Sequence, residues 1–395
     1  MGKYQVNQEK ITQAYNMLKD SGIDLWMILT SEGSDPCLPL IPGVKTVGPG
    51  AFIFTSAGTS YALCSSIDAQ DIEESKLFDE VIKYSSTGLG EPLKKLIENL
   101  EPKNIALNFS QDEHLCDGLT MGRYRWLLET LGKGYEKKFV SSEKILTRLR
   151  SIKSPEELRR IKEAVRITQE IYDTVLNQIE VGMSEIEIGQ LFIDEMTQRD
   201  VVSAGSKALT PPIVMKERIA HRGPGEARLV PGDFLIMDFG VDYEGYVADI
   251  ARTAYVLKEG EMEAPPYFQE VFQTAHGAIT AAIDAIKPGA KGFEVDEVAR
   301  NYILERNLPE ITHATGHQVG RIPHDGGTLL GPRWDRYGKA PYGLIEEGMV
   351  FTVEPTIFVE NGPAVLVEEN IVVKTKGAEL LSKRQDQLFL IGPKK

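Results

Sequence analysis

The sequence predicts an α/β domain followed by an α+β domain. The chain has 395 residues, and single hydrophobic cores stop growing at roughly 250–300 residues, so two domains are expected. Helix and strand patterns alternate over the first part, whereas helices precede β-hairpins in the second. A polar and basic segment, residues 142–154, separates the two parts. We therefore place the domains at residues 1–145 and 146–395.

Helix and strand signals follow one another in the first domain. Residues 9–20 have the apolar spacing of an amphipathic helix, and residues 24–30 (DLWMILT) form an apolar run typical of a buried strand. Residues 51–64 indicate two strands around a Ser-Ala-Gly-Thr turn. The remaining elements are expected at 68–76 (helix), 79–85 (strand), 90–99 (helix), 104–109 (strand) and 119–131 (helix). This alternation is typical of helices packed on a sheet.

Two capping boxes begin the helices of the second domain. Residues 154–157 (SPEE) supply an N-cap serine, a proline at the first helical position and a glutamate that reaches back to the cap. Residues 184–187 (SEIE) repeat the signature before a helix that ends near residue 198. Later elements are expected at 266–286 and 292–307 (helices) and at 233–239, 245–256, 349–359 and 364–374 (strands).

Composition limits the classes of function. Acidic residues outnumber basic ones by 58 to 44, which argues against nucleic acid as a partner because phosphate binding requires a clustered positive field. No stretch of about 18 apolar residues lacks charge, and the first residues lack the apolar core of a secretory signal. The three cysteines, Cys37, Cys64 and Cys116, are too few and too far apart for a disulfide scaffold or a paired-cysteine zinc site. We therefore expect no membrane contact and a reduced, cytoplasmic protein.

Two carboxylates lie in apolar runs of the first expected hairpin, residues 233–256. Residues 241–245 (VDYEG) form a polar turn between two β-rich runs. With the turn centred at 243–244, Asp238 and Asp249 are directly opposite, and their side chains lie about 5 Å apart on one face. Like charges so placed destabilise a sheet unless something neutralises them. The pair therefore indicates a cation.

The second expected hairpin, residues 349–373, repeats this arrangement. Its turn signal is Asn361-Gly362, and Glu354 and Glu368 are symmetric about residue 361. Glu369 has the wrong parity for that face, although a slip of one residue would exchange the two glutamates. An acidic residue in one strand usually faces solvent. Two hairpins with opposed carboxylates, and a histidine cluster between them, favour a metal site instead.

Histidine is scarce and concentrated in one region. Four of the six histidines are His221, His313, His317 and His324. Glycines interrupt residues 313–327, and glycine lets the backbone approach a site closely. One imidazole with four carboxylates is an oxygen-rich set that suits two divalent ions such as Mn²⁺, Co²⁺, Fe²⁺ or Zn²⁺. Two ions about 3.5–4 Å apart can together activate a water and polarise a carbonyl.

These motifs resemble those of the pita-bread metallopeptidases, which include prolidase (Xaa-Pro dipeptidase), aminopeptidase P, methionine aminopeptidase and their relative creatinase. The resemblance rests on five motifs in order: MDFG with Asp238, ADIART with Asp249, HATGHQVG with His317, GMVFTVEP with Glu354 and VLVEEN with Glu368. The paired carboxylates are 11 and 14 residues apart, as in the family. The resemblance covers about residues 145–390 well and the first 145 residues more loosely. It implies a creatinase-type α/β N-terminal domain and an α+β pita-bread catalytic domain.

The resemblance also implies a role for each matching ligand. Asp238 would chelate one ion, and Asp249 and Glu368 would bridge two. His317 and Glu354 would complete the ligands of the second ion. Glu354 would in addition act as general base and take a proton from the bridging water, which attacks the carbonyl as hydroxide.

Two further histidines match catalytic positions of the family. His324, in IPHDGG, matches the histidine that stabilises the tetrahedral intermediate. His221 lies 17 residues before Asp238, where the family has an active-site histidine, and would assist proton transfer or substrate binding. His313 either supports the metal ligands or is structural.

The implied activity is metal-dependent hydrolysis of an amide bond, first of all the X–Pro bond of a short peptide. One position departs from the family: Leu366 stands where prolidases and aminopeptidases P commonly have an arginine that, in prolidases, helps hold substrate. Arg321, Arg333 or Arg336 could replace it. Dipeptidase, aminopeptidase and creatinase-like hydrolysis of another C–N bond therefore stay open.

Two further expectations follow from the resemblance. The N-terminal domain of this family commonly helps dimerise, which implies a homodimer. A non-catalytic protein-binding module of the same fold is a remaining alternative, but such relatives typically lose metal ligands and this chain retains them.

Overall fold

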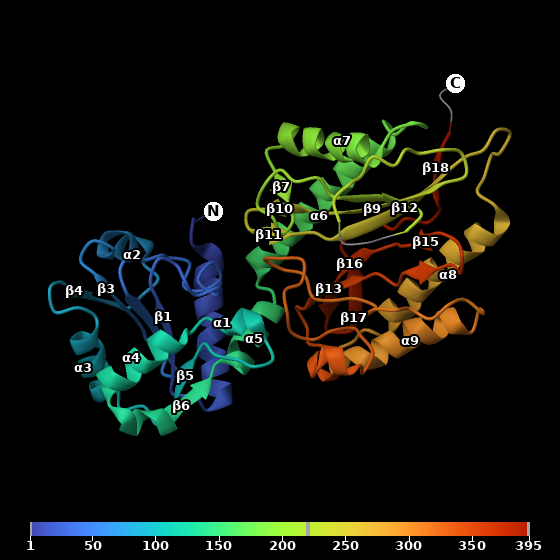
Figure 1. Ribbon diagram of the computed structural model, residues 1–395. Helices are drawn as coiled ribbons and strands as arrows, with labels where there is room; N and C mark the ends of the chain where they lie inside the picture. Colours follow the sequence, from blue (N-terminus) through green and yellow to red (C-terminus); the bar gives the residue numbers. More distant parts are fainter. Residues whose placement is uncertain (1, 219–221, 393–395) are drawn as a thin grey trace. The chain divides into compact units, whose positions relative to one another are not determined.

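The computed structural model describes residues 2–218 and 222–392. The chain divides into two compact units, Met1–Arg150 and Ser151–Lys395 (Figure 1). The boundary expected after residue 145 falls inside helix α5 (Glu143–Ser151), at the end of which the units divide. Polar and basic residues obscure this helix in the sequence, but Ile145, Leu146 and Leu149 are buried at helical spacing.

A mixed sheet forms the centre of the first unit, with strand order β4-β3-β2-β1-β5-β6. Strand β2 is antiparallel to both β1 and β3, and the other neighbours are parallel. The strands are β1 (Leu25–Thr30), β2 (Gly50–Thr55), β3 (Ser60–Ser65), β4 (Glu80–Tyr84), β5 (Ile105–Leu107) and β6 (Phe139–Ser141). The helices are α1 (Gln5–Ser21), α2 (Ala69–Ser75), α3 (Gly90–Leu100), α4 (Met121–Leu131) and α5, with 3₁₀ turns at His114–Cys116 and Lys133–Lys138.

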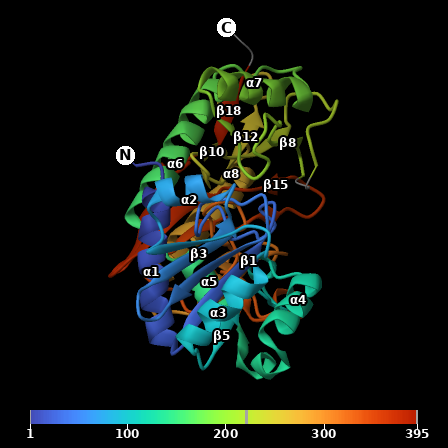
Figure 2. The same cartoon turned by 90° about the vertical axis from the view of Figure 1, so that its left-hand side faces the viewer.

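Alternate residues of the buried strand β1 face opposite sides of this sheet. Met27 and its neighbours two residues away pack with Leu93 of α3 and Leu127 of α4. The ring of Trp26 contacts Phe54, which also contacts Tyr15 of α1. Helices therefore cover both faces (Figure 2), as expected for an α/β domain. All three cysteines are buried and unpaired.

The second unit contains two groups of helices followed by strands. The first group consists of α6 (Pro155–Leu176), α7 (Glu185–Gln198), β7 (Val202–Ser203), β8 (Ile213–Lys216), β9 (Phe234–Phe239), β10 (Val241–Tyr243), β11 (Tyr246–Val247) and β12 (Ile250–Val256). The second consists of α8 (Pro266–Ala285), α9 (Gly292–Leu304), 3₁₀ turns at Asp335–Tyr337 and Ala340–Tyr342, β13 (Val350–Val353), β14 (Ile357–Phe358), β15 (Ala364–Val365), β16 (Glu369–Lys374), β17 (Gly377–Leu380) and β18 (Phe389–Ile391).

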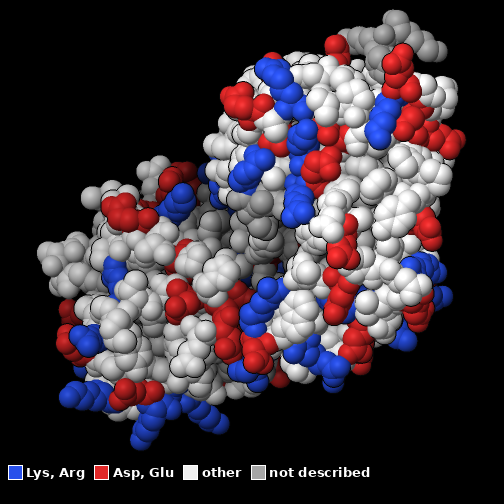
Figure 3. Space-filling model, turned by 45° about the vertical axis from the view of Figure 1, so that its right-hand side comes forward, with Lys and Arg blue, Asp and Glu red and all other residues white. Residues whose placement is uncertain are grey.

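Each group packs its helices against its own strands. Helix α6 contacts α7, β10 and β11, while α8 contacts α9, β13 and β17. The strands form the sheets β18-β12-β9-β8, β11-β10-β7, β13-β16-β17 and β14-β15. Acidic and basic side chains are intermixed on the face of the molecule drawn in Figure 3. Among the helices described, none is long and apolar enough to cross a membrane.

Both predicted capping boxes are present. The Ser154 hydroxyl accepts a hydrogen bond from the backbone of Glu157, whose carboxylate accepts one from the Ser154 amide at 2.7 Å. Ser184 and Glu187 make the same reciprocal bonds at the start of α7.

Replacing Ser154 by alanine is expected to lower the free energy of unfolding of the second unit by about 1 kcal/mol, because an N-cap hydroxyl is lost. Urea denaturation measures the change. The matched control is Thr174→Ala in the same helix, where the hydroxyl donates to the Glu170 carbonyl one turn earlier. That variant should be neutral or slightly more stable. Equal losses in the two variants would contradict the capping assignment.

The first carboxylate hairpin differs in register from the expected one. Asp238 lies opposite Ala251, so the expectation that it directly opposes Asp249 is wrong. Glu244 and Gly245 both have positive φ, 50° and 81°, and the turn is therefore centred between them, one residue later than expected. The partner of Asp238 is therefore two residues later than expected, and a shift by two residues leaves each side chain on the same face of the sheet. Both aspartates still line one cavity, as diagonal rather than direct neighbours.

The second hairpin has the expected register. Val353 lies opposite Glu369, and Ile357 lies opposite Val365, so both ladders are symmetric about residue 361. The strands expected at 349–359 and 364–374 are interrupted between these ladders. There the Glu354 amide donates to the Thr315 carbonyl at 2.7 Å, and the Glu368 amide donates to the Ala251 carbonyl at 3.2 Å. The hairpin therefore opens where its two glutamates lie.

Candidate metal centre

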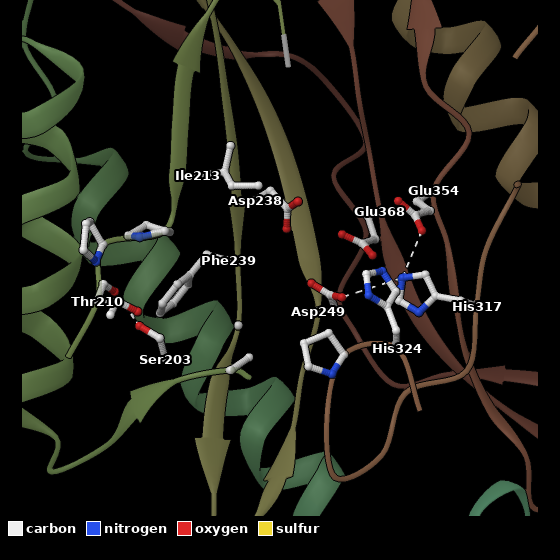
Figure 4. Close-up of a pocket in the computed structure, with 15 residues that line it drawn as sticks. Ser203, Thr210, Ile213, Asp238, Phe239, Asp249, His317, His324, Glu354 and Glu368 are labelled. Carbon is white, nitrogen blue, oxygen red and sulfur yellow. Dashed lines mark hydrogen bonds and ion pairs between the residues drawn. The ribbon is translucent and has the colours of Figure 1, made fainter. Parts of the chain in front are cut away.

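Four carboxylates and two imidazoles of the second unit line one cavity of about 270 Å³ (Figure 4). They belong to Asp238, Asp249, His317, His324, Glu354 and Glu368. The first hairpin supplies the aspartates, the second supplies the glutamates, and the segment between the hairpins supplies the histidines. All six are residues that the sequence analysis singled out, and the fold brings them together.

His317 stands between two of the carboxylates. Its Nε2 lies 3.2 Å from Oε1 of Glu354 and 3.8 Å from Oδ2 of Asp249. One ligand atom each from Asp249, His317 and Glu368 lie within 4.8 Å of one another. Nδ1 of His317 lies 3.3 Å from the carbonyl oxygen of Gln318. An Nδ1–H donated there leaves the Nε2 lone pair facing the carboxylates, which is the tautomer that ligates a metal.

Burial and mutual repulsion govern the charges of the carboxylates. Burial raises the pKa of Asp238 and of Glu368 well above the ordinary range, and the neighbouring carboxylates raise both further. Burial likewise raises the pKa of Asp249 to about 6, against the attraction of His317.

Glu354 and His317 form the charged pair of the site. Burial disfavours the charge on Glu354, but the hydrogen bond and charge of His317 outweigh it, so the pKa of Glu354 is lowered. Burial lowers the pKa of the His317 imidazole, but the hydrogen bond and charge of Glu354 and then the charge of Asp249 outweigh it. The pKa of His317 is therefore raised to about 9. Three carboxyls with raised pKa thus surround one ion pair.

This donor set fits divalent cations. It consists of carboxylate oxygens and one imidazole nitrogen, ligands that Mn²⁺, Co²⁺, Fe²⁺ and Zn²⁺ share. The carboxyl groups are close together and largely buried, so a positive charge is needed to hold them ionised. No lysine or arginine is among the described residues that line the cavity.

Three residues that sequence reasoning missed hold the ligands in place. The Tyr172 hydroxyl on α6 lies 2.9 Å from the carbonyl oxygen preceding Asp238 and 2.7 Å from the one following Asp249. Asn370 donates to the Asp249 carbonyl at 2.6 Å and accepts from its amide at 3.1 Å. The Thr352 hydroxyl accepts from the His317 amide at 3.1 Å and donates to Glu354 at 3.2 Å. Asn370 and Thr352 stand within two residues of the predicted glutamates, which was an available signal.

Glu368, which immediately precedes β16, and Glu369, its first residue, point in opposite directions. Glu368 lines the cavity. Glu369 is fully buried on the other face, where it lies 3.2 Å from Nη2 of Arg252 and accepts from the Gln385 amide at 3.2 Å. This placement agrees with the parity argument that preferred Glu368 for the cavity.

The other histidines differ in their relation to the cavity. The ring centroid of His324 lies 4.3 Å from that of His317, and His324 also lines a second cavity of about 460 Å³. His313 lines the second cavity but is not among the residues that line the first. Its Nδ1 lies 2.7 Å from the Ala314 carbonyl oxygen. His221 lies outside the described residues.

Leu366 lies in the wall of the second cavity and is buried. The three arginines considered as substitutes for the family arginine are occupied elsewhere. Arg321 stacks 5.1 Å from the ring centroid of Tyr246, Arg333 pairs with Glu297, and Arg336 donates to the Thr312 carbonyl. None of the three is among the described residues that line either cavity.

Comparison with known proteins identifies the family. Residues 159–375 match metallopeptidase family M24, and the chain belongs to this family. An uncharacterised peptidase of Staphylococcus aureus is 28% identical over 344 residues, which cover 84% of this chain and 87% of that protein.

Solved structures agree with this placement. An Xaa-Pro dipeptidase from Bacillus anthracis has a TM-score of 0.76 at 23% identity, covering 98% of this chain and 100% of that one. An X-Pro aminopeptidase from Thermotoga maritima has a TM-score of 0.74 at 25% identity, covering 94% and 99%. The predicted family, the two-part fold with a pita-bread domain, and the enzyme class, a metallopeptidase, are confirmed.

Proposed function

We propose that this protein is a dinuclear metallopeptidase that hydrolyses the X–Pro bond of short peptides. The observation that carries the proposal is the convergence of five potential ligands on one largely buried cavity: Asp238, Asp249, His317, Glu354 and Glu368. When bound, two divalent ions would polarise the amide carbonyl and make a water nucleophilic at neutral pH. The X-Pro aminopeptidase and Xaa-Pro dipeptidase among the structural neighbours support the substrate class.

The protein's own residues supply the proton transfers. Glu354 is ionised at neutral pH because its pKa is lowered, and it takes the proton that the attacking water gives up. His324 lies where the two cavities meet and donates a hydrogen bond to the carbonyl oxygen as it becomes negative. His221 is proposed on its sequence position alone to assist proton transfer or substrate binding.

The second cavity favours substrates longer than dipeptides. Its walls include Leu329, Phe358 and Leu366, and no lysine or arginine is among its described lining residues. A dipeptide carries its terminal carboxylate on the residue that follows the scissile bond, and the described lining of this cavity offers no lysine or arginine to pair with it. A peptide with at least three residues carries this charge at least one residue further from the scissile bond. Hydrolysis of a non-peptide C–N bond, as in creatinase-like relatives, is the alternative.

A substrate panel with added Mn²⁺, Co²⁺ or Zn²⁺ tests the proposal. We expect X-Pro-Y tripeptides to be cleaved with a kcat/KM at least about tenfold above that of X-Pro dipeptides, because an unpaired buried carboxylate costs more than 1.4 kcal/mol. Preferential cleavage of dipeptides would instead identify a prolidase. Hydrolysis of small amidines, with no cleavage of any peptide by the metal-loaded protein, would replace the peptidase proposal by the creatinase-like alternative.

We further propose a homodimer in the cytoplasm, on the family resemblance. Light scattering coupled to gel filtration measures the oligomeric state. A mass near the 43.9 kDa of one chain would contradict the dimer.

A further inference from the structure

A buried ion pair lies behind the segment that carries His324. Lys153 Nζ is 3.0 Å from Oδ2 of Asp325, and the two side chains are 1% and 3% exposed. Lys153 immediately precedes the cap of α6, whereas Asp325 immediately follows His324, so the pair joins parts of the chain 172 positions apart. Removing one member of a buried pair leaves an uncompensated charge, which is strongly destabilising.

The backbone around this pair is packed without spare room. A Cβ at Gly320 would lie 2.0 Å from Oδ2 of Asp325 and 2.7 Å from Nζ of Lys153. The Asp325 amide donates to the Gln318 carbonyl at 2.9 Å, and the Gly320 carbonyl accepts from the Val247 amide at 2.9 Å. The pair is therefore the centre of a closed turn, residues 318–325, that is held at both ends.

His324 and Pro323 are the residues of this turn that line the cavity of the candidate metal centre. The ring of His324 packs against His317, and His324 lines both cavities. Lys153 and Asp325 are absent from the described lining of both cavities. Any effect of the pair on hydrolysis must therefore be indirect, and His324, the chain neighbour of Asp325, is the residue of the turn with a proposed catalytic role.

We propose that Lys153 is a positioning residue, whose buried ion pair with Asp325 fixes the turn so that His324 faces the metal centre. The part of this inference that concerns hydrolysis rests on the proposed function, since that function gives His324 its role. Reacting groups must be held in a narrow geometry, and a misplacement of about 1 Å can cost about 100-fold in rate. Buried ion pairs add little stability over apolar side chains of the same volume. A geometric role accounts for an ion pair at this place.

Lys153→Met is the principal test. We expect kcat to fall about 10- to 100-fold with KM within about twofold, because the group displaced acts on the transition state. Bound metal should be unchanged. The matched control is Lys10→Met: Lys10 is also buried, and its Nζ donates to the Leu149 carbonyl at 2.7 Å and to Gln13 at 2.9 Å within the first unit. That variant loses a buried ammonium too, but should keep the wild-type kcat.

Gly320→Ala perturbs the same pair without removing a charge. The added methyl must displace at least one of the side chains of Lys153 and Asp325, so kcat should fall in the same way. Gly122→Ala is its control, because a Cβ there meets nothing within 4 Å. If Lys153→Met fails to fold, Gly320→Ala carries the test.

Histidine resonances give a readout independent of hydrolysis. With six histidines in the chain, the His324 signal can be assigned from a His324→Gln spectrum. It should shift in the metal-loaded Lys153→Met and Gly320→Ala proteins, while the signals of His114 and His276 stay in place. An unshifted His324 signal together with wild-type kcat would overturn the inference. A shifted signal in a protein whose wild type cleaves no substrate would uphold the positioning role and reject the proposed function.

Discussion

Replacing Glu368 by glutamine is expected to reduce peptide hydrolysis by about 10³-fold or more, because loss of a metal ligand removes several kcal/mol of transition-state stabilisation. One ligand atom of Glu368 lies within 4.8 Å of those of Asp249 and His317. Glutamine preserves the shape of the side chain but not its charge, so the metal content should fall below that of the wild type. Elemental analysis and steady-state kinetics on the same preparation measure the two effects.

The neighbouring residue provides the control. Glu369→Gln makes the same chemical change one position later, on the opposite face, where Glu369 pairs with Arg252. That variant should bind as much metal as the wild type, but its free energy of unfolding should fall by about 3 kcal/mol, since Arg252 loses a buried counter-charge. Full metal loading of Glu368→Gln would contradict the ligand set proposed for the site.

Removing the metal ions is expected to destabilise the second unit by about 3 kcal/mol or more, if free metal was at least about 100-fold above its Kd. On the proposed function, the ions would bind only the folded protein, because the four carboxylates of Asp238, Asp249, Glu354 and Glu368 come from two hairpins that are more than 100 residues apart in the chain. Calorimetry with and without a chelator measures the loss as a lower Tm. Equal Tm values in the two conditions would show that the site holds no ion under those conditions.

The same comparison has a defined pH dependence. In the metal-free protein the pKa of Asp249 is raised to about 6, and the pKa values of Asp238 and Glu368 are raised further. A raised carboxyl pKa means that the folded protein keeps protons that the unfolded chain releases above about pH 4. The contribution of these three carboxyls to the stability of the metal-free protein therefore falls as the pH rises from about 4 through 6.

The affinity for metal instead rises with pH, because the ligands must be deprotonated. The gain in Tm on adding metal should therefore be larger at about pH 8 than at about pH 5. Groups outside the site contribute equally with and without metal, so they cancel in this difference. A gain that is the same at both pH values, or larger at the lower one, would contradict the assignment of buried carboxyls as the ligands.

Much of the candidate site follows from the sequence because its residues break local rules. Asp238 and Asp249 stand in apolar strands where aspartate is a poor strand former. The second register was predicted correctly because Asn361-Gly362 marks its turn clearly. The register of the first hairpin was predicted two residues away from the observed one, because Glu244, which takes the left-handed conformation beside Gly245, does not mark a turn in the sequence.

Two of the supporting residues, Tyr172 and Lys153, could not be predicted in the same way. Tyr172 occupies a buried position of an amphipathic helix, and nothing local separates its hydroxyl role from ordinary packing. Lys153 belongs to a basic segment that the composition marks as a boundary, and its partner Asp325 lies 172 positions away. Such contacts depend on tertiary structure, which neither propensity nor periodicity reports.

The two hairpins hold one another's carboxylate-bearing segments in place. Asn370 holds the backbone of Asp249 from 121 positions later, and Arg252 donates to the Glu368 carbonyl across 116 positions. Contacts between segments so distant form late, after the loss of chain entropy that loop closure requires. The arrangement of the four carboxylates is therefore complete only when both hairpins are folded against each other. A substitution that loosens one hairpin should for this reason also disturb the carboxylates of the other.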